Sequence, residues 1–259
     1  GADKEARTSF GGTPLLLAIS FDAVDIVAYL CRNGADLKAT TNHVHDEDGT
    51  PLLRAARYCN VEIVRILLAC GSNIEATDHR LGSTPLGLAT SKLSFIPFIK
   101  ENENEIERTL ETVRLIIAFG ANIEATDDEG YTPFLNAARR NNIRMVELLH
   151  DCGANVAATT SLQETALHLV IESFELEEIE DFKLEDFLTV EWLLNNGADK
   201  EARRWDGETA LLMAIGNSDL LKYLCDAGCD VNVKNAGETA LIRAAQHGFW
   251  DVEALCTHH

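Results

Sequence analysis

The chain has 259 residues, of which 46% are hydrophobic and 25% are charged, a composition that is ordinary for a soluble folded protein. Its 42 acidic and 22 basic residues give a formal net charge of -20. Because nucleic-acid affinity depends on Lys and Arg neutralising phosphates, nucleic acid and anionic membranes are poor candidates as direct partners. No uninterrupted apolar run approaches the roughly 18 residues that a membrane-spanning helix needs.

One phrase recurs along the chain, in which a threonine opens a short apolar segment. The phrase reads TPLLLAI, TPLLRAA, TPLGLAT, TPFLNAA, TALHLVI, TALLMAI and TALIRAA, and its threonines are Thr13, Thr50, Thr84, Thr132, Thr165, Thr209 and Thr239. Threonine is a good helix N-cap, and proline is tolerated at the first helical position, where Pro14, Pro51, Pro85 and Pro133 stand. Each threonine is therefore expected to start a helix.

A second apolar segment follows each of the first six phrases and ends at a glycine, in the motifs GAD, GSN, GAN or GCD. The glycines are Gly34, Gly71, Gly120, Gly153, Gly197 and Gly228. Glycine accepts the left-handed conformation that ends many helices, so these segments read as outer helices that stop at the glycine. Start and stop signals alternate along the chain, which predicts a row of helix pairs.

Self-similarity at a period of about 33 residues is typical of stacked helical repeats, and these phrases resemble the ankyrin repeat over essentially the whole chain. The resemblance implies an all-α solenoid of about seven helix-turn-helix repeats with β-turn fingers, in which fingers and inner helices form a concave binding surface. A single array over residues 1–259 is expected. Its repeats would span approximately residues 7–39, 40–76, 77–125, 126–158, 159–202, 203–233 and 234–257, with 1–6 as the remnant of a preceding repeat.

Two repeats are longer than the others. The distance from capping threonine to glycine is 21 residues in the first, second and fourth repeats, but 36 in the third and 32 in the fifth. The extra residues must lie in the two helices or the turn between them, around 92–112 and 172–191, and Pro97 should break any helix in the first. The second carries nine acids and one lysine, and either packs Phe174, Ile179, Phe182, Phe187 and Leu188 locally or docks a basic partner.

Both ends look cut. The chain begins at GADKEA, which reads as the close of a finger, and it ends after an apolar segment with Phe249, Trp250, Val252 and Leu255. Stable solenoids usually carry polar terminal repeats, so we expect a segment of a longer protein. Seven cysteines without a CxxC pair, and the absence of an Asn-x-Ser/Thr sequon, favour buried free thiols and an intracellular, cytoplasmic location, with the nucleus as the alternative.

Basic side chains are concentrated where the resemblance places the concave surface, although the whole chain is acidic. The predicted contact residues there are Arg54, Arg57, Tyr58, Asn136, Arg139 and Arg140, and Arg243 occupies a corresponding position. Arg139 and Arg140 equally suit a helix C-terminus between two acidic insertions, which would make them charge-balancing residues. Tyr and Arg are frequent in binding hot spots, which favours partner contact at Arg54, Arg57 and Tyr58.

Two aromatic residues are expected on fingers, Tyr131 and Trp205, and each either contacts a partner or stacks on the next finger. His43 and His45, followed by Asp46, Glu47 and Asp48, give no closed ligand set, so no metal is expected. His168 stands where the family uses a histidine for hydrogen bonds between repeats. No catalytic or phosphate-binding motif is present, and neither an enzyme nor a cofactor is expected.

The predicted function is a protein-interaction module that binds a protein or peptide, such as an acidic segment, on the concave surface. One alternative is a substrate-recognition or regulatory arm of a larger multidomain enzyme or receptor, which the apolar ends favour. Another is an architectural spacer whose groove contacts nothing.

Overall fold

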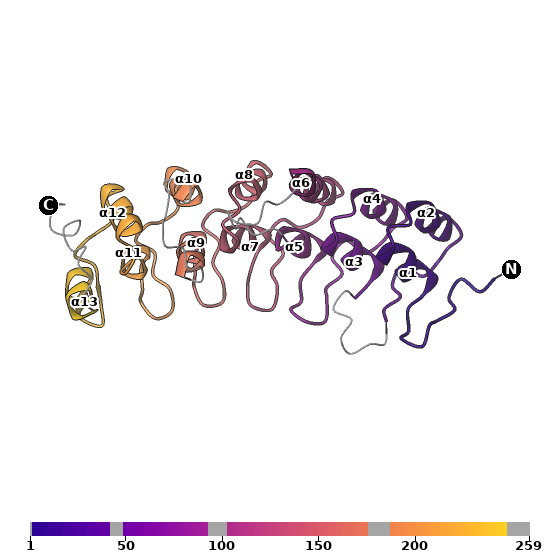
Figure 1. Cartoon of the computed structure of the whole chain (residues 1–259), viewed down its shortest axis with the longest axis horizontal. Coiled ribbons are helices and arrows are strands. Elements are labelled where there is room, and N and C mark those ends of the chain that lie inside the picture. Colours follow the sequence, from indigo (N-terminus) through magenta and orange to yellow (C-terminus); the bar gives the residue numbers. More distant parts are fainter. Residues whose placement is uncertain (1, 42–48, 93–102, 176–186, 248–259) are drawn as a thin grey trace.

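The computed structural model describes residues 2–41, 49–92, 103–175 and 187–247. In this part of the chain the helices follow one another in a single elongated row, with helix-rich and finger-rich long edges (Figure 1). The expected all-α solenoid is therefore confirmed. The long finger with its histidines and acids at 43–48, Pro97, and the last apolar segment at 249–255 lie outside the described residues.

Helices come in pairs, each made of an inner and an outer helix. The pairs are α1 (Pro14–Ser20) with α2 (Val24–Arg32), α3 (Pro51–Arg57) with α4 (Val61–Ala69), α5 (Pro85–Thr90) with α6 (Glu103–Ala118), α7 (Pro133–Arg139) with α8 (Ile143–Asp151), α9 (Ala166–Glu175) with α10 (Leu188–Asn195), and α11 (Ala210–Met213) with α12 (Ser218–Asp226). A short hairpin of β1 (Lys234–Asn235) and β2 (Glu238–Thr239) then leads into α13 (Ala240–His247). Neighbouring inner helices pack on one another from α1 to α11, and outer helices pack as α2 on α4, α4 on α6 and α8 on α10.

Capping explains where the helices start. The hydroxyls of Thr13, Thr84 and Thr132 accept from the backbone N–H three residues later at 3.4, 3.2 and 3.2 Å. Asparagine plays the same part in front of three outer helices, where Asn60, Asn142 and Asn217 accept at 3.1, 3.1 and 3.0 Å. The sequence reasoning used the threonines and missed the asparagines, although asparagine is among the strongest N-caps.

The core is one continuous apolar layer between the helices. Its largest fully buried side chain is Phe134 on α7, whose ring lies 6.4 Å from that of Trp192 on α10. The second insertion adds to this layer, because Phe174 and Phe187 are buried and their rings meet edge to face at 5.5 Å. Part of the first insertion lengthens α6, which has 16 residues where α4 has 9. Local packing thus accounts for Phe174 and Phe187, while Leu188 is exposed.

Main-chain hydrogen bonds join neighbouring fingers. Asp128 donates to the Leu81 carbonyl at 2.8 Å, Ser161 to that of Glu129 at 3.1 Å, and Trp205 to that of Leu162 at 3.0 Å. Gly130 permits one of these approaches, since its φ is +86° and an added Cβ would lie 2.6 Å from the Ser161 nitrogen. Four successive fingers are therefore connected tip to tip.

The six cysteines in the described part of the chain are all free thiols. Cys31, Cys59, Cys225 and Cys229 are buried, as expected, whereas Cys70 and Cys152 are exposed because they are the C-cap residues of outer helices α4 and α8. Burial, together with the neighbouring Cys70, raises the pKa of Cys31 to about 11, and burial with the charge of Glu201 raises that of Cys229 to about 11. None of the described helices combines the length and apolarity needed to cross a bilayer.

Candidate functional site

The inner helices α1, α3, α5 and α7 end next to one another, and the residues at these ends form the candidate site. Each residue stands eight positions after a capping threonine, which gives the series Phe21, Tyr58, Lys92 and Arg140. Phe21, Tyr58 and Arg140 are the C-cap residues of α1, α3 and α7. We call these four residues, with Arg57 and Arg139 directly before two of them, the cap row.

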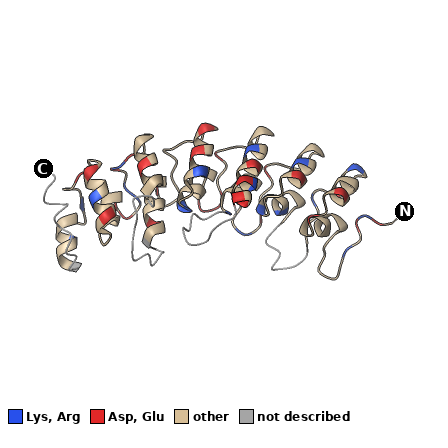
Figure 2. Cartoon of the chain, turned by 45° about the horizontal axis from the view of Figure 1, so that its top comes forward, with Lys and Arg blue, Asp and Glu red and all other residues tan. Residues whose placement is uncertain are grey.

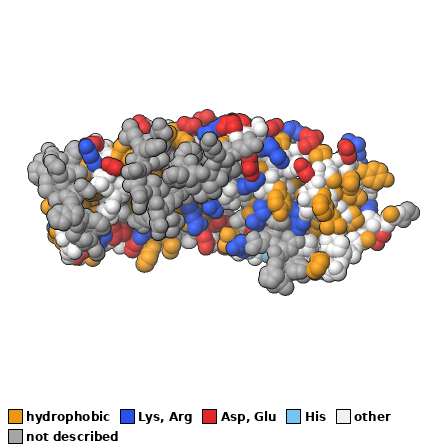
Figure 3. Space-filling view, viewed as in Figure 1, with side chains coloured by type: hydrophobic (Ala, Val, Ile, Leu, Met, Phe, Trp, Pro, Cys, Tyr) orange, Lys and Arg blue, Asp and Glu red, His pale blue; other side chains and the backbone are white. Residues whose placement is uncertain are grey.

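Packing of consecutive inner helices makes the cap row continuous. α1 packs on α3, α3 on α5 and α5 on α7. The Lys92 ammonium reaches back to the Tyr58 carbonyl at 3.4 Å, so a direct contact links two neighbouring positions of the row. Figure 3 shows the result on the surface, with hydrophobic side chains gathered at the N-terminal end over α1 and α2 and Lys and Arg side chains over α3, α5 and α7.

Two cations of the row are held by acids from neighbouring elements. Arg57 lies 3.5 Å from the buried Asp78 of the next finger and keeps 28% of its side chain exposed. Lys92 lies 3.0 Å from Glu105 on α6. The Tyr58 side chain is 51% exposed. These contacts orient the basic groups while leaving part of each accessible.

Arg139 and Arg140 at the end of α7 are both exposed. The Arg139 guanidinium lies over the Tyr131 ring, 5.0 Å from its centroid, and such cation–π contacts fix a cation without neutralising it. Although the Arg140 side chain is exposed overall, partial desolvation, followed by the charge of Arg139, lowers its pKa. Burial also raises the pKa of Tyr131, so its hydroxyl stays protonated at neutral pH. The two adjacent arginines are a concentrated positive charge suited to an anionic group.

Two other predicted contact residues are less accessible than expected. Arg54 is only 8% exposed and donates to the Ser20 hydroxyl at 2.9 Å, so its side chain joins α3 to the preceding repeat. Asn136 is half-buried on α7. Helical spacing alone did not distinguish the buried Arg54 from Arg57 one turn later.

Trp205 lies apart from the cap row, on the finger that precedes α11. Its side chain is 64% exposed, and its backbone N–H bonds to Leu162, which is also exposed at the tip of the preceding finger. Tyr131, in contrast, is brought to the row through Arg139. The structure therefore places Tyr131 beside Arg139 at the end of α7 and leaves Trp205 on a separate finger surface.

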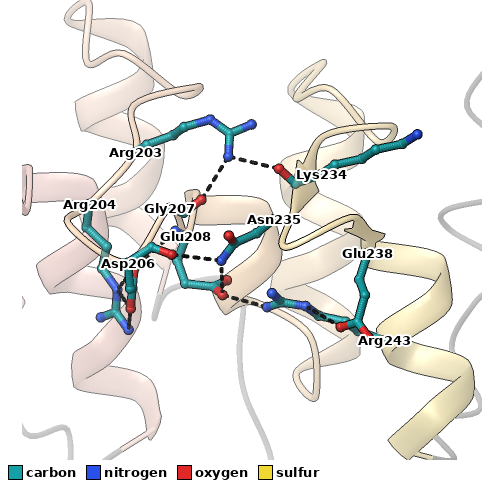
Figure 4. A network of polar contacts seen from close by, with 9 residues as sticks. All are labelled: Arg203, Arg204, Asp206, Gly207, Glu208, Lys234, Asn235, Glu238 and Arg243. Carbon is teal, nitrogen blue, oxygen red and sulfur yellow. Dashed lines mark hydrogen bonds and ion pairs between the residues drawn. The ribbon is translucent and has the colours of Figure 1, made fainter.

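The C-terminal repeats carry basic residues whose charges are matched internally (Figure 4). Arg243 lies 2.6 Å from Glu208 and 3.6 Å from Glu238, and Asn235 also donates to Glu208 at 2.7 Å. Arg204 pairs with Asp206 at 2.8 Å. Arg243 therefore stabilises the last repeats, although its position corresponds to that of Arg54.

Asp206 gives this network a pH dependence. Burial alone would raise its pKa, but the hydrogen bonds and charge of Arg204 and the Glu208 N–H lower it below the ordinary value of 3.8. A lowered carboxyl pKa stabilises the fold above the unfolded pKa, and this contribution is lost as the pH falls through the folded pKa.

We expect Asp206→Asn to lower the free energy of unfolding at pH 7 by at most about 1 kcal/mol, because the pair is partly exposed. The difference from the parent protein should disappear towards pH 3, as measured by urea denaturation at several pH values. An equal difference at pH 7 and pH 3 would contradict the assignment of the lowered pKa to this carboxylate.

Charges on the outer helices are mixed, with Lys and Arg beside Asp and Glu along the row (Figure 2). One example is Arg65 on α4, 3.5 Å from Glu62 and 3.9 Å from Glu111. The described residues contain no group of three or more His, Cys, Asp and Glu side chains that could hold a metal ion. His168 is buried and its Nδ1 lies 2.9 Å from the Thr165 hydroxyl, while burial lowers its pKa. The basic cap row therefore differs from the outer helices, where basic and acidic side chains are mixed.

Phe21 and Lys92 were missed by sequence reasoning. Both stand at the same distance from a capping threonine as Tyr58 and Arg140, so the signal was present in the repeat register. Lys92 was assigned to the start of an insertion, and Phe21 was not singled out. Comparing equivalent positions across repeats would have found both.

Comparison with known proteins identifies the family. A family model described as ankyrin repeats (3 copies) matches residues 1–78 and 183–259, and one described as ankyrin repeats (many copies) matches residues 106–150. The crystal structure of the ankyrin repeat domain of Bcl-3, described as a unique member of the IkappaB protein family, aligns with a TM-score of 0.68 and 24% identity over 90% of this chain and 93% of that chain. No curated protein sequence matches.

The chain belongs to the ankyrin-repeat family, whose members are generally protein-interaction modules. The resemblance predicted from the threonine and glycine phrases is confirmed.

Proposed function

We propose that this chain is a protein-interaction module that binds an acidic segment of a partner protein on its concave surface, with the cap row as the main contact. The observation that carries the proposal is the gathering of Arg57, Lys92, Arg139 and Arg140 at the ends of three consecutive inner helices in a chain of net charge -20. A surface patch with charge of one sign attracts ligands of the opposite sign, so this local basic surface favours an acidic segment.

The mechanism is recognition by a rigid receptor. The positions of the cap row are fixed by helix packing, and the Asp78 and Tyr131 contacts hold Arg57 and Arg139, so little ordering entropy is lost on binding. Arginine donates paired hydrogen bonds to a carboxylate, and these charge-assisted bonds are stronger than neutral ones. Tyr58 beside Arg57 adds apolar contact area and a hydroxyl.

The remaining predicted residues have different places in this proposal. Asn136 would donate a side-chain hydrogen bond next to Arg140, and Tyr131 would keep Arg139 in position while contacting the partner. Trp205 would be a second apolar anchor for a partner that extends over the fingers. Arg54 would stabilise α3, which carries Arg57 and Tyr58, through its hydrogen bond to the Ser20 hydroxyl of the preceding repeat.

The double variant Arg139→Gln, Arg140→Gln is expected to weaken binding of a fluorescein-labelled oligo-glutamate peptide roughly tenfold, which corresponds to about 1.4 kcal/mol. Fluorescence anisotropy at about 0.15 M salt is suitable, because the Debye length is then about 8 Å and distant charges are screened.

A matched control is Arg32→Gln, Arg65→Gln, which changes the net charge equally on outer helices α2 and α4. Its affinity for the peptide should stay within about twofold of the parent's, well short of the roughly tenfold loss, equivalent to about 1.4 kcal/mol, expected of the first variant. Equal weakening by both variants would refute the cap row as the site. No binding by the parent would favour an architectural spacer.

The free thiols support an intracellular, cytoplasmic location for this interaction.

A further inference from the structure

The cap row changes character along its length. Its first two positions are aromatic, Phe21 and Tyr58, and its last two are cationic, Lys92 and Arg140. Phe21 is 80% exposed, the largest exposed fraction among the large hydrophobic residues of the described chain. A phenylalanine at a helix end with this exposure gains from contact with an apolar group, and burial of such a side chain is favourable.

We propose that the row binds an extended peptide segment with apolar residues at one end, on Phe21 and Tyr58, and acidic residues at the other, on Lys92 and Arg140. This inference rests on the proposed function and adds the order of residue types in the partner. Charge complementarity places the acidic end of the ligand over Lys92 and Arg140, at the ends of α5 and α7. The apolar end of the ligand then lies over the exposed aromatic pair.

Helix packing sets the spacing of the ligand. Packed helices lie about 8–10 Å apart, so the three steps from Phe21 to Arg140 cover about 24–30 Å. An extended chain spans about 3.3 Å per residue, so successive contact residues of the ligand are about three positions apart and the first and last are about eight positions apart. The partner pattern is therefore two apolar residues about three positions apart, followed at the same interval by acidic residues.

The test uses synthetic peptides with the 259-residue chain. One labelled peptide carries leucines at the first two contact positions, glutamates at the last two and serines elsewhere, with roughly three-residue spacing. A second is its sequence reversal, because the chain direction on the surface is open. A third replaces both leucines with serine.

The better of the two leucine peptides should bind roughly tenfold more tightly than the leucine-free peptide in an anisotropy titration. Phe21→Ala should remove this gain and leave the affinity of the leucine-free peptide unchanged. Phe119→Ala is the matched control, since it removes an exposed phenylalanine at the end of the outer helix α6 and should leave the gain intact.

The outcomes separate the two proposals. If Arg139→Gln, Arg140→Gln weakens all three peptides but neither the leucines nor Phe21→Ala changes affinity, the apolar end is wrong and the acidic site stands. If Phe21→Ala and Phe119→Ala reduce binding equally, the loss is not local and the inference is overturned. If the arginine variant has no effect on any peptide, the proposed function fails as well.

Discussion

Replacing Phe134 with alanine is expected to lower the free energy of unfolding by about 3–5 kcal/mol. The ring is fully buried on α7, next to Trp192 of α10, so truncation removes apolar contacts in two repeats and leaves a cavity. Urea denaturation followed by far-UV circular dichroism measures the change. Because each repeat contacts only its neighbours, the array is also expected to lose cooperativity at α7 and to unfold in two phases.

Phe119→Ala provides the comparison, since this phenylalanine follows α6 and is exposed. Its effect on stability should stay within about 0.5 kcal/mol. A decrease in the free energy of unfolding of less than about 1 kcal/mol for Phe134→Ala would be close to that of a surface substitution. It would show that the fourth repeat contributes little to the stability of the array.

Replacing Asp78 with alanine is expected to cost roughly 2–4 kcal/mol and to disturb the candidate site at the same time. One carboxylate oxygen accepts from the backbone N–H groups of Leu81 and Ser83 at 3.1 and 3.0 Å, and the other lies 3.5 Å from Arg57. Removal leaves the two backbone donors without their acceptor and takes one ionic partner from Arg57. Thermal or urea unfolding gives the stability change, and the glutamate-peptide titration gives the effect on the cap row.

Asp78→Asn separates the two roles, because the amide oxygen can still accept both backbone hydrogen bonds but carries no charge for Arg57. Most of the stability should return. Asp127→Ala is a further control, since Asp127 makes the same two finger bonds, to Glu129 and Tyr131, without an arginine. Equal losses for Asp78→Ala and Asp127→Ala would mean that the pair with Arg57 adds nothing.

The sequence predicted the helices well where a local signal marked them. Thr13 and Thr132, each followed by proline, start inner helices as expected, because capping depends on residues within one turn. No local sequence signal showed which side chains are buried by contacts with a neighbouring repeat. Arg54 and Arg57 lie one turn apart on α3, yet one bonds to Ser20 of the preceding repeat and the other to Asp78 of the following finger.

The candidate site was predicted in part for the same reason. Arg57, Tyr58, Arg139 and Arg140 stand at the ends of α3 and α7. Lys92, at the end of the intervening α5, was assigned to the start of an insertion, and Phe21 was not singled out. Tyr131 was expected on a finger, and its contact with Arg139 could not be inferred because it depends on how the finger folds back onto α7. Register within the repeat predicts position, while partners are set by packing between repeats.

The main-chain bonds between the finger tips of Leu81, Asp128, Glu129, Ser161, Leu162 and Trp205 make one margin of the molecule stiffer than the other. Thermal motion should therefore change the distances between outer helices more than the distances between finger tips. Lys92 and Arg140 follow inner helices that pack directly on each other, α5 on α7, so their separation should vary less than that of the outer helices.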